Sequence, residues 1–585
     1  MSAQEDGSPV VPSAEPLAII QLPPLKTFVD DLLTFGETAL PPQEFNQLKT
    51  FATMLPGFPE FNSFVPDAGV TVVAQGASVV AAPQAFILVK LKDDETFTEN
   101  ARFLGLAHRK FDEWTVLSPA ADALAGIEEI EPWVGLTDRP KPHEVTATFF
   151  NSEQLRQQAQ MLAGFALSAQ VEDSEGNFQK LMQELFKRLG NLPSAQIGLE
   201  LGPDALKTAF LLNVREGSPE ADLVNAEVPS VSELAAKVPA IGPINLLGGI
   251  NYGPWVTYLE NLAPHVTPAM DEGVRAVWDL YLENLRILND ANVDAFAGSI
   301  SGFDMERGYE TMIVVMEGQI NRGELLRMVE LQSKEIVSKI MDLSGVSGLA
   351  PRVEIEEEAG EIDGEKVIQV SITQDLAGMA DEESPEVTQE QFYLPVDGNL
   401  LMASSFDELQ NLAEAYREGV SGQTIAEAVG EVEGFAMSID AGSWFESLAS
   451  ALGEDAAGME SLAAVEGEPI QIRAQAGNNT AAFSIEIGAN LLQQIVVASK
   501  EMEAQAAVAN TERTAHNNLR MIASAGQQYL LETGESRVSY RQLEGEYFAP
   551  IEPVAGEDYT ALVITENSDS LSVTLENGTE VTYEF

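Results

Sequence analysis

The 585-residue chain contains no cysteine, which excludes disulfide bonds, thiolate metal sites and cysteine nucleophiles. Basic residues are also few, because 32 Lys and Arg stand against 92 Asp and Glu, and the formal net charge is −60. Proteins bind nucleic acids and anionic lipid surfaces by neutralising phosphates with cations. We therefore expect no nucleic-acid partner and no more than weak binding of divalent cations by the acidic surface.

Long apolar runs are missing as well: none approaches the ~18–20 residues that cross a bilayer, so we expect no membrane insertion. The first residues, MSAQEDGSPVVPSAEP, lack the basic and apolar regions of a signal peptide and are similar to the polar leader that follows a removed one. These features predict an extracytoplasmic protein in the periplasm, at the cell surface or secreted, with its signal peptide removed. A cytoplasmic protein with a frayed N-terminus is the alternative.

Four segments repeat one pattern, in which a short apolar strand and a polar break precede an amphipathic helix. They are LAIIQLPPLKTFVDDLL from Leu17, VTATFFNSEQLRQQAQML from Val145, INLLGGINYGPWVTYLENL from Ile244 and GFAMSIDAGSWFESLASAL from Gly434. A hairpin of alternating residues follows each segment, for example AQIGLELGPDALKTAFLLNV and IQIRAQAGNNTAAFSIEI, as expected of half-buried antiparallel strands. The sequence predicts an α+β fold of repeated β-α-β-β units that form antiparallel sheets with helices on one face.

We expect four parts along the chain: a flexible leader over 1–15, a first super-repeat of two units over 16–235, a second over 236–498, and a C-terminal part over 499–585. Within the second super-repeat, the acidic insertion 354–390 predicts a solvated hairpin or loop around one apolar strand. Trp255 and Trp444 occupy matched places in two predicted helices, so we expect both in the core.

The C-terminal part begins with a helix that ends at Gly534 and has one apolar face. A strand-rich tail follows, and it closes with a hairpin at Asn577-Gly578. This part, about 85 residues long, resembles the soluble headgroup region of the type IV pilin and type II secretion pseudopilin family. The residues that carry the resemblance are Asn518, Leu519, Arg520, Ile522, Gln528, Tyr529, Gly534, Pro553, Ala555, Gly556 and Tyr559.

Pilins have an apolar helical stem that packs in the core of the pilus. The resemblance does not include this stem, because the residues before Asn518 are polar and acidic. What it implies is a bacterial protein whose pilin-like C-terminal part serves as a docking or capping module. A helix and hairpin that only cap the last sheet of a repeat array would have the same sequence pattern. The repeat region is similar to uncharacterised bacterial exported repeat proteins.

No catalytic, cofactor-binding or metal-binding residues can be nominated from the sequence. The four histidines, which form no metal-binding pair, are His108, His143, His265 and His516. Walker, dinucleotide-binding and GxSxG motifs are missing, and the acidic turns at Asp173 and Asp397 lack the spacing of a calcium loop. We therefore expect a protein that is not an enzyme and has no cofactor, although a dispersed catalytic site would leave no local pattern.

Three functions follow, in descending order of support. The first is an exported, non-enzymatic scaffold or surface-assembly protein of a bacterial envelope, which binds protein partners or assembles with itself through the pilin-like module. The second is a periplasmic carrier or binding protein that holds an apolar ligand, such as lipid, between sheet and helices. The third is a hydrolase with a dispersed site.

Overall fold

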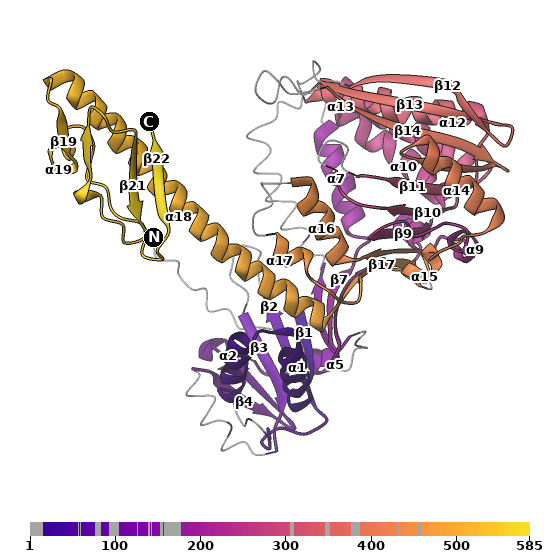
Figure 1. Ribbon diagram of the computed structural model, residues 1–585. Helices are drawn as coiled ribbons and strands as arrows, with labels where there is room; N and C mark the ends of the chain where they lie inside the picture. The colour runs from indigo at the N-terminus through magenta and orange to yellow at the C-terminus, as the bar shows by residue number, and fades with distance from the viewer. Residues whose placement is uncertain are drawn as a thin grey trace. The chain divides into compact units, whose positions relative to one another are not determined.

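The computed structural model describes residues 16–585 with the exception of 56, 57, 59, 77–83, 93–96, 98–104, 126, 138–140, 142, 152–155, 157–176, 305–308, 345–350, 376–385, 431 and 453–458. The predicted leader over 1–15 and the acidic turn at Asp173 lie outside the described residues. The chain forms two compact units (Figure 1). The first unit comprises Met1–Leu452 and Val465–Gln494, and the second comprises Gly453–Ala464 and Ile495–Phe585.

The first unit is built on one sheet of 18 strands. In chain order they are β1 (Ala18–Pro24), β2 (Gly69–Gln75), β3 (Gln84–Lys90), β4 (Ala107–Phe111), β5 (Trp114–Ser118), β6 (Val145–Phe150), β7 (Ser194–Leu201), β8 (Ala205–Asn213), β9 (Ile244–Gly249), β10 (Ala295–Ile300), β11 (Met312–Glu317), β12 (Arg352–Ile362), β13 (Glu365–Asp375), β14 (Glu386–Val396), β15 (Asn399–Ala403), β16 (Phe435–Ile439), β17 (Ile470–Gly477) and β18 (Thr480–Gly488). All the strand pairs are antiparallel, which confirms the predicted α+β class with antiparallel strands.

The strands on the two sides of a central pair, β8 and β18, are arranged in equivalent orders. Outward from the centre, one side runs β8-β7-β6-β1-β2-β3-β5. The other side runs β18-β17-β16-β9-β10-β11-β15. Thr480 of β18 donates a hydrogen bond to Asn213 of β8, 267 positions earlier in the chain. The two halves of the first unit are therefore joined edge to edge into a single sheet.

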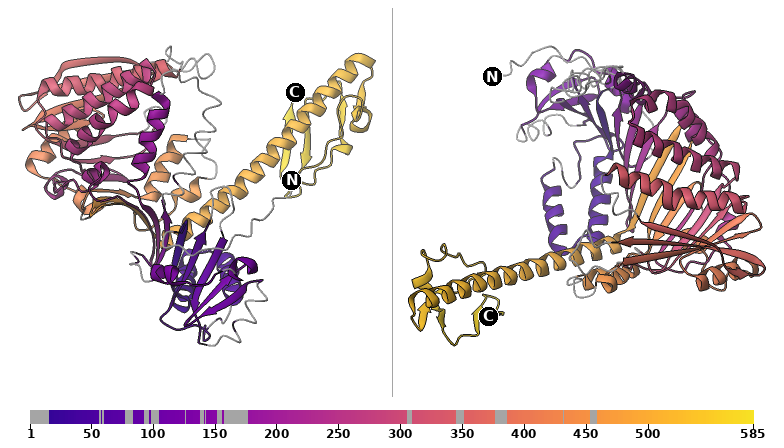
Figure 2. Two further views of the ribbon diagram at one scale, coloured as in Figure 1. Left: turned by 180° about the vertical axis from the view of Figure 1, so that it is seen from behind. Right: turned by 90° about the horizontal axis from the view of Figure 1, so that it is seen from above.

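The helices of the first unit lie between these strands in the chain. Those described are α1 (Leu25–Ala39), α2 (Pro42–Thr53), α4 (Ala121–Ala125), α5 (Glu131–Thr137), α7 (Asn177–Leu189), α8 (Pro219–Val224), α9 (Ser232–Ala235), α10 (Tyr252–Val266), α11 (Glu272–Asp290), α12 (Arg322–Glu330), α13 (Val337–Leu343), α14 (Phe406–Glu418), α15 (Ile425–Val429) and α16 (Ala441–Leu452). Figure 2 shows that the sheet is strongly curved and that several of the longer helices lie across one of its faces.

Helices cover both faces of the sheet, so the prediction of helices on one face is wrong. Leu400 and Leu401 are neighbours on β15 and point to opposite faces. Leu400 packs in a core with Leu325 of α12, whereas Leu401 packs in a core with Leu409 of α14. The reason is that these strands are apolar on both faces, and each face must be buried against its own layer. We call the face of Leu400 the front face and the face of Leu401 the back face.

One row of directly paired residues runs along the front face from Leu400 on β15 to Leu117 on β5. At the β15 end this row lies under α11 and α12. At the β5 end it packs against Val29 of α1 and Ala52 of α2. Long helices therefore cover both ends of the front face.

The described strands of the acidic insertion 354–390 belong to the sheet. β12 and β13 form the predicted hairpin, and β14 extends it toward β15. Ile368 and Val370 of β13 are fully buried in the core beneath α12, so the prediction of a solvated insertion is wrong for this strand. The glutamate-rich β12 lies at the edge of the sheet, where charge discourages pairing with other chains.

The two matched tryptophans have different surroundings. Trp444 of α16 packs edge-on against Phe303, with 5.8 Å between the ring centroids. Trp255 of α10 is 45% exposed, so its predicted place in the core is wrong. The buried side of α10 is formed by its neighbour Val256 instead.

A buried ion network joins α7, α8 and α10. The Arg188 guanidinium contacts Glu184 at 2.8 Å and Glu220 at 3.1 Å, and all three side chains are at least 87% buried. Asn191 and the Tyr258 hydroxyl also donate to Glu220, at 2.7 and 3.1 Å. Burial alone would raise the pKa of the Glu220 carboxyl, but these hydrogen bonds outweigh it and hold the pKa below its usual value. The network therefore connects a helix of the first half of the sheet to a helix of the second.

The second unit packs one end of a long helix against small sheets. It contains α17 (Glu460–Ala463), most of the 45-residue α18 (Ala489–Thr533), β19 (Arg537–Ser539), α19 (Tyr540–Leu543), β20 (Val563–Thr565), β21 (Ser570–Thr574) and β22 (Glu580–Glu584). β19 pairs with β20, and β21 pairs with β22. Ala515, Leu519 and Ile522 of α18 are fully buried among residues of these strands. Gly526 allows the closest approach, since a Cβ there would lie 2.4 Å from Ile564.

Candidate functional site: an apolar groove in the first unit

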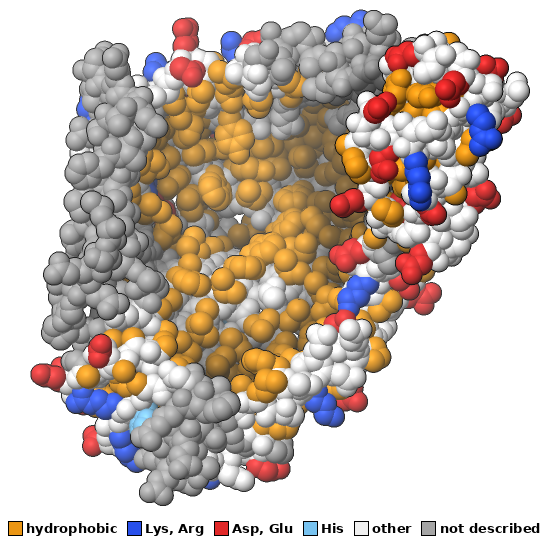
Figure 3. Space-filling view, turned by 90° about the vertical axis from the view of Figure 1, so that its left-hand side faces the viewer, with side chains coloured by type: hydrophobic (Ala, Val, Ile, Leu, Met, Phe, Trp, Pro, Cys, Tyr) orange, Lys and Arg blue, Asp and Glu red, His pale blue; other side chains and the backbone are white. Residues whose placement is uncertain are grey.

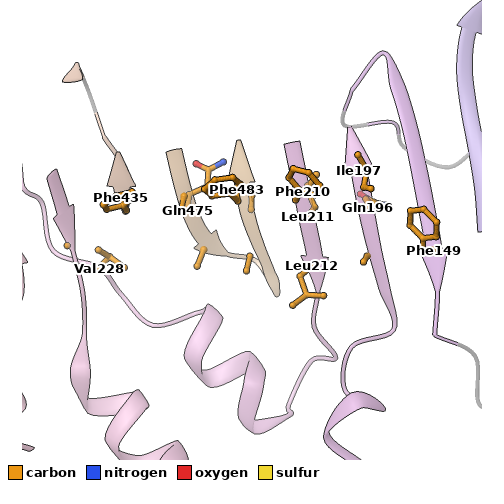
Figure 4. Close-up of a pocket in the computed structure, with 17 residues that line it drawn as sticks. Phe149, Gln196, Ile197, Phe210, Leu211, Leu212, Val228, Phe435, Gln475 and Phe483 are labelled. Atoms are coloured by element: carbon orange, nitrogen blue, oxygen red, sulfur yellow. The ribbon is translucent and has the colours of Figure 1, made fainter. Parts of the chain in front are cut away.

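The middle of the front face, which no described helix covers, is an apolar groove of about 650 Å³. Its floor consists of two rows of paired residues, which cross β6, β7, β8, β18, β17 and β16 (Figure 4). The first row contains Ile197, Phe210, Phe483, Ala474 and Phe435. The second row, two residues farther along the strands, contains Phe149, Ala195, Leu212, Ala481 and Ala476.

Large apolar side chains on this floor remain accessible to solvent. Their exposed fractions are 47% for Phe149, 41% for Ile197, 46% for Phe210, 37% for Leu212 and 38% for Phe483. Figure 3 shows such side chains gathered over a hollowed face of the protein. Single exposed apolar residues are ordinary, but a contiguous patch of them marks a place where another molecule binds.

The floor is rigid because paired strands form it. Phe210 and Phe483 lie opposite each other on the central strands, with ring centroids 6.4 Å apart. On the back face of the same strand, Ala209 is buried. β8 is thus apolar on both faces: Ala209 is buried on the back face, and Phe210 is 46% exposed on the front face.

The described lining of the groove carries no charged group. Among the described residues that line it, the polar side chains are those of Gln196 and Gln475, and none is ionisable. The next residue of three of its strands is also neutral and polar. Asn213 donates to the Ser194 hydroxyl at 3.0 Å, and Thr480 donates to Asn213 at 3.1 Å. Because neighbouring side chains on a strand point to opposite faces, these amides and hydroxyls bond to one another on the back face and do not line the groove.

The pilin-like residues lie in the second unit, where several of them meet. Asn518 of α18 donates to the Tyr559 hydroxyl at 3.1 Å, and that hydroxyl donates to Glu557 at 2.9 Å. The Glu557 carboxylate accepts hydrogen bonds from the backbone N–H groups of Val554 and Ala555 at 2.9 and 2.8 Å. These bonds link the two stretches that carry the resemblance, and the central residue, Glu557, was not among those predicted.

The remaining pilin-like residues have simpler environments. Leu519 and Ile522 are core residues, and the rings of Tyr529 and Tyr547 meet at 5.7 Å. Gly534 ends α18 and Gly556 lies in a turn, both with positive φ angles (71° and 74°). Arg520, Gln528 and Pro553 are exposed. Gln528 donates to Glu532 at 2.8 Å, and the Tyr547 hydroxyl donates to the same carboxylate at 2.7 Å.

Acid should destabilise the second unit through Glu557. Burial alone would raise the pKa of this carboxyl, but its hydrogen bonds outweigh burial and hold the pKa below the usual value. A carboxyl whose pKa is lower in the folded than in the unfolded protein stabilises the fold when the pH is above the unfolded-state pKa. This contribution is lost as the pH falls toward the folded-state pKa. In hydrogen-exchange mass spectrometry, we expect peptides from β20 to β22 to lose protection as pH falls below about 4.5.

The variant Glu557→Gln should weaken this protection at neutral pH by about 1–3 kcal/mol, because an amide cannot accept all three hydrogen bonds. It should also flatten the pH dependence. Glu552→Gln changes an exposed glutamate nearby and is the matched control. Equal effects of the two variants would show that Glu557 has no special role.

Other candidate chemistry is sparse in the part of the chain that the structure describes. There, no group of three His, Asp or Glu residues lies where it could hold a metal ion. His143 lies against Gly198 and approaches Glu200 at 2.8 Å, and Lys207 contacts the same carboxylate at 3.8 Å. None of the described helices has the length and apolar character needed to cross a membrane.

The sequence analysis missed the groove residues although it found their strands. Ile197, Phe210 and Phe483 all lie in the two hairpins whose alternation predicted β7–β8 and β17–β18. The available signal was one phenylalanine in each hairpin, Phe210 and Phe483, on a strand with alternating residues. Nothing local distinguishes such residues from a face that a helix covers.

Comparison of the chain with models of protein families, with curated proteins and with solved structures finds no match.

Proposed function

We propose that the protein is a binding protein or carrier for an apolar ligand such as lipid, which the first unit holds in the groove. The observation that carries this proposal is the continuous apolar floor, with five large side chains between 37% and 47% exposed. Its volume of about 650 Å³ falls within the ~300–1,000 Å³ of small-molecule sites. Because the floor is made of paired strands, the ligand would not have to order it on binding.

The expected result is that protein purified under mild conditions contains lipid and binds an apolar fluorescent probe. Organic extraction followed by mass spectrometry identifies the lipid, and N-phenyl-1-naphthylamine fluorescence measures the site after delipidation. We expect micromolar affinity, or about −8 kcal/mol. Protein unfolded in guanidinium is the control for nonspecific probe binding. The absence of both extracted lipid and saturable probe binding would reject the proposal.

A role as an extracytoplasmic, non-enzymatic scaffold, with the second unit as its docking or capping module, is a second proposal. It is supported by the Asn518–Tyr559–Glu557 hydrogen bonds, which join the two pilin-like stretches. Light scattering of the full chain over a range of concentrations would test self-assembly.

We also propose that the sheet derives from repeated β-α-β-β units, because the strand order outward from β8 is equivalent to that outward from β18.

A further inference from the structure

The shape of the groove constrains its ligand. Its first row crosses adjacent strands from β7 to β16, and the second row begins one strand farther out, on β6. Six adjacent strands span five intervals of ~4.8 Å, or about 24 Å, whereas two rows are only about 7 Å apart along the strands. The floor is therefore a long, narrow strip perpendicular to the strands.

A linear hydrocarbon chain matches this strip. One leaflet of a bilayer has an apolar thickness of ~15 Å, half of the ~30 Å core, so an acyl chain fits within the strip lengthwise. The aromatic rings of Phe210 and Phe483 lie at the middle of the strip, where they would contact the chain. A broad, rigid ring system would extend past the two rows.

The charges constrain the other end of the ligand. A carboxylate or phosphodiester removed from water needs a cation or several hydrogen-bond donors beside it. The groove has no ionisable lining residue among those described, and its polar lining residues are only Gln196 and Gln475. The net charge of −60 adds long-range repulsion of anions, which salt screens.

We propose that the ligand is a lipid with a linear acyl chain, which lies across the strands from β6 to β16, and with a head group that carries no net negative charge. This inference rests on the proposed function of the groove and names the ligand class. A zwitterionic phospholipid such as phosphatidylcholine meets both conditions. Phosphatidylglycerol has the same chains but an anionic head group, and a sterol is neutral but rigid.

The test incubates the delipidated full chain with vesicles of phosphatidylcholine or of phosphatidylglycerol with identical acyl chains, and with vesicles that contain dehydroergosterol. Bound lipid is measured by native mass spectrometry after the vesicles are removed. We expect about tenfold more phosphatidylcholine than phosphatidylglycerol at low salt, a smaller ratio at high salt, and little sterol. Equal or greater binding of phosphatidylglycerol, or tight binding of the sterol, would overturn the inference.

A variant pair strengthens the test. Leu212→Lys introduces a cation into the second row and should shift the preference toward phosphatidylglycerol by about tenfold relative to Leu212→Gln, which changes polarity without charge. Tryptophan fluorescence confirms that both variants are folded. If no lipid and no apolar probe binds to the natural protein, the proposed function fails. If both phospholipids bind equally, the function stands and the inference about the head group fails.

Discussion

Replacing Phe210 with glutamate should reduce apolar probe binding by at least about 30-fold, which corresponds to ~2 kcal/mol. Phe210 lies at the centre of the first row, between Ile197 and Phe483. The substitution removes an aromatic contact and places a carboxylate where a bound ligand would strip it of water. The measurement is a titration with N-phenyl-1-naphthylamine.

The matched control is Phe51→Glu. Phe51 lies on α2 outside the groove and is 61% exposed, more than Phe210, so the same change there should leave probe binding within a factor of about two. Because Phe210 is nearly half exposed, the variant should also remain folded, and tryptophan fluorescence will show this. Equal losses in the two variants would indicate that the probe binds to general apolar surface instead of to the groove.

The second large effect should come from Arg188→Met, which we expect to destabilise the first unit by about 3–5 kcal/mol. The substitution leaves Glu220, whose side chain is 12% exposed, without a cation. Glu184, at 9% exposure, keeps only the exposed Lys187 at 3.3 Å. Stacking of the guanidinium over the Tyr258 ring, at 4.9 Å from its centroid, is lost as well. The penalty arises mainly from the buried carboxylates that remain.

Urea unfolding monitored by tryptophan fluorescence measures this effect selectively, because all five tryptophans lie in the first unit. The control is Arg286→Met. Arg286 also binds a glutamate, Glu260, at 2.7 Å, but its side chain is 49% exposed, so the cost should stay below about 1 kcal/mol. If the two variants were equally stable, the network would not hold α7, α8 and α10 together.

The double variant Arg188→Met with Glu220→Gln sharpens the interpretation. If the cost of the single change comes from an unpaired buried charge, neutralising Glu220 should recover part of the lost stability. An additive loss would instead point to the packing of the arginine side chain.

Local patterns in the sequence determined much of the secondary structure. Alternation around Gly477, Asn478 and Asn479 predicted the β17–β18 hairpin, and all three residues have positive φ angles. Ser405 caps α14, since its hydroxyl accepts from the Glu408 N–H at 3.2 Å. These features depend on contacts between residues near in sequence, which turn and helix-end chemistry specifies directly.

The amino-acid sequence by itself thus determined the hairpins, the helix caps, the absence of thiol chemistry and the acidic charge of this protein. Only the tertiary structure decided that β8 pairs with β18, that helices cover both faces of the sheet, and that none of the described helices covers the middle of the front face. Phe210 and Val370 both lie in alternating, apolar strands, yet one is 46% exposed and the other is fully buried. The difference depends on which distant helix reaches each strand, and a local pattern carries no information about that.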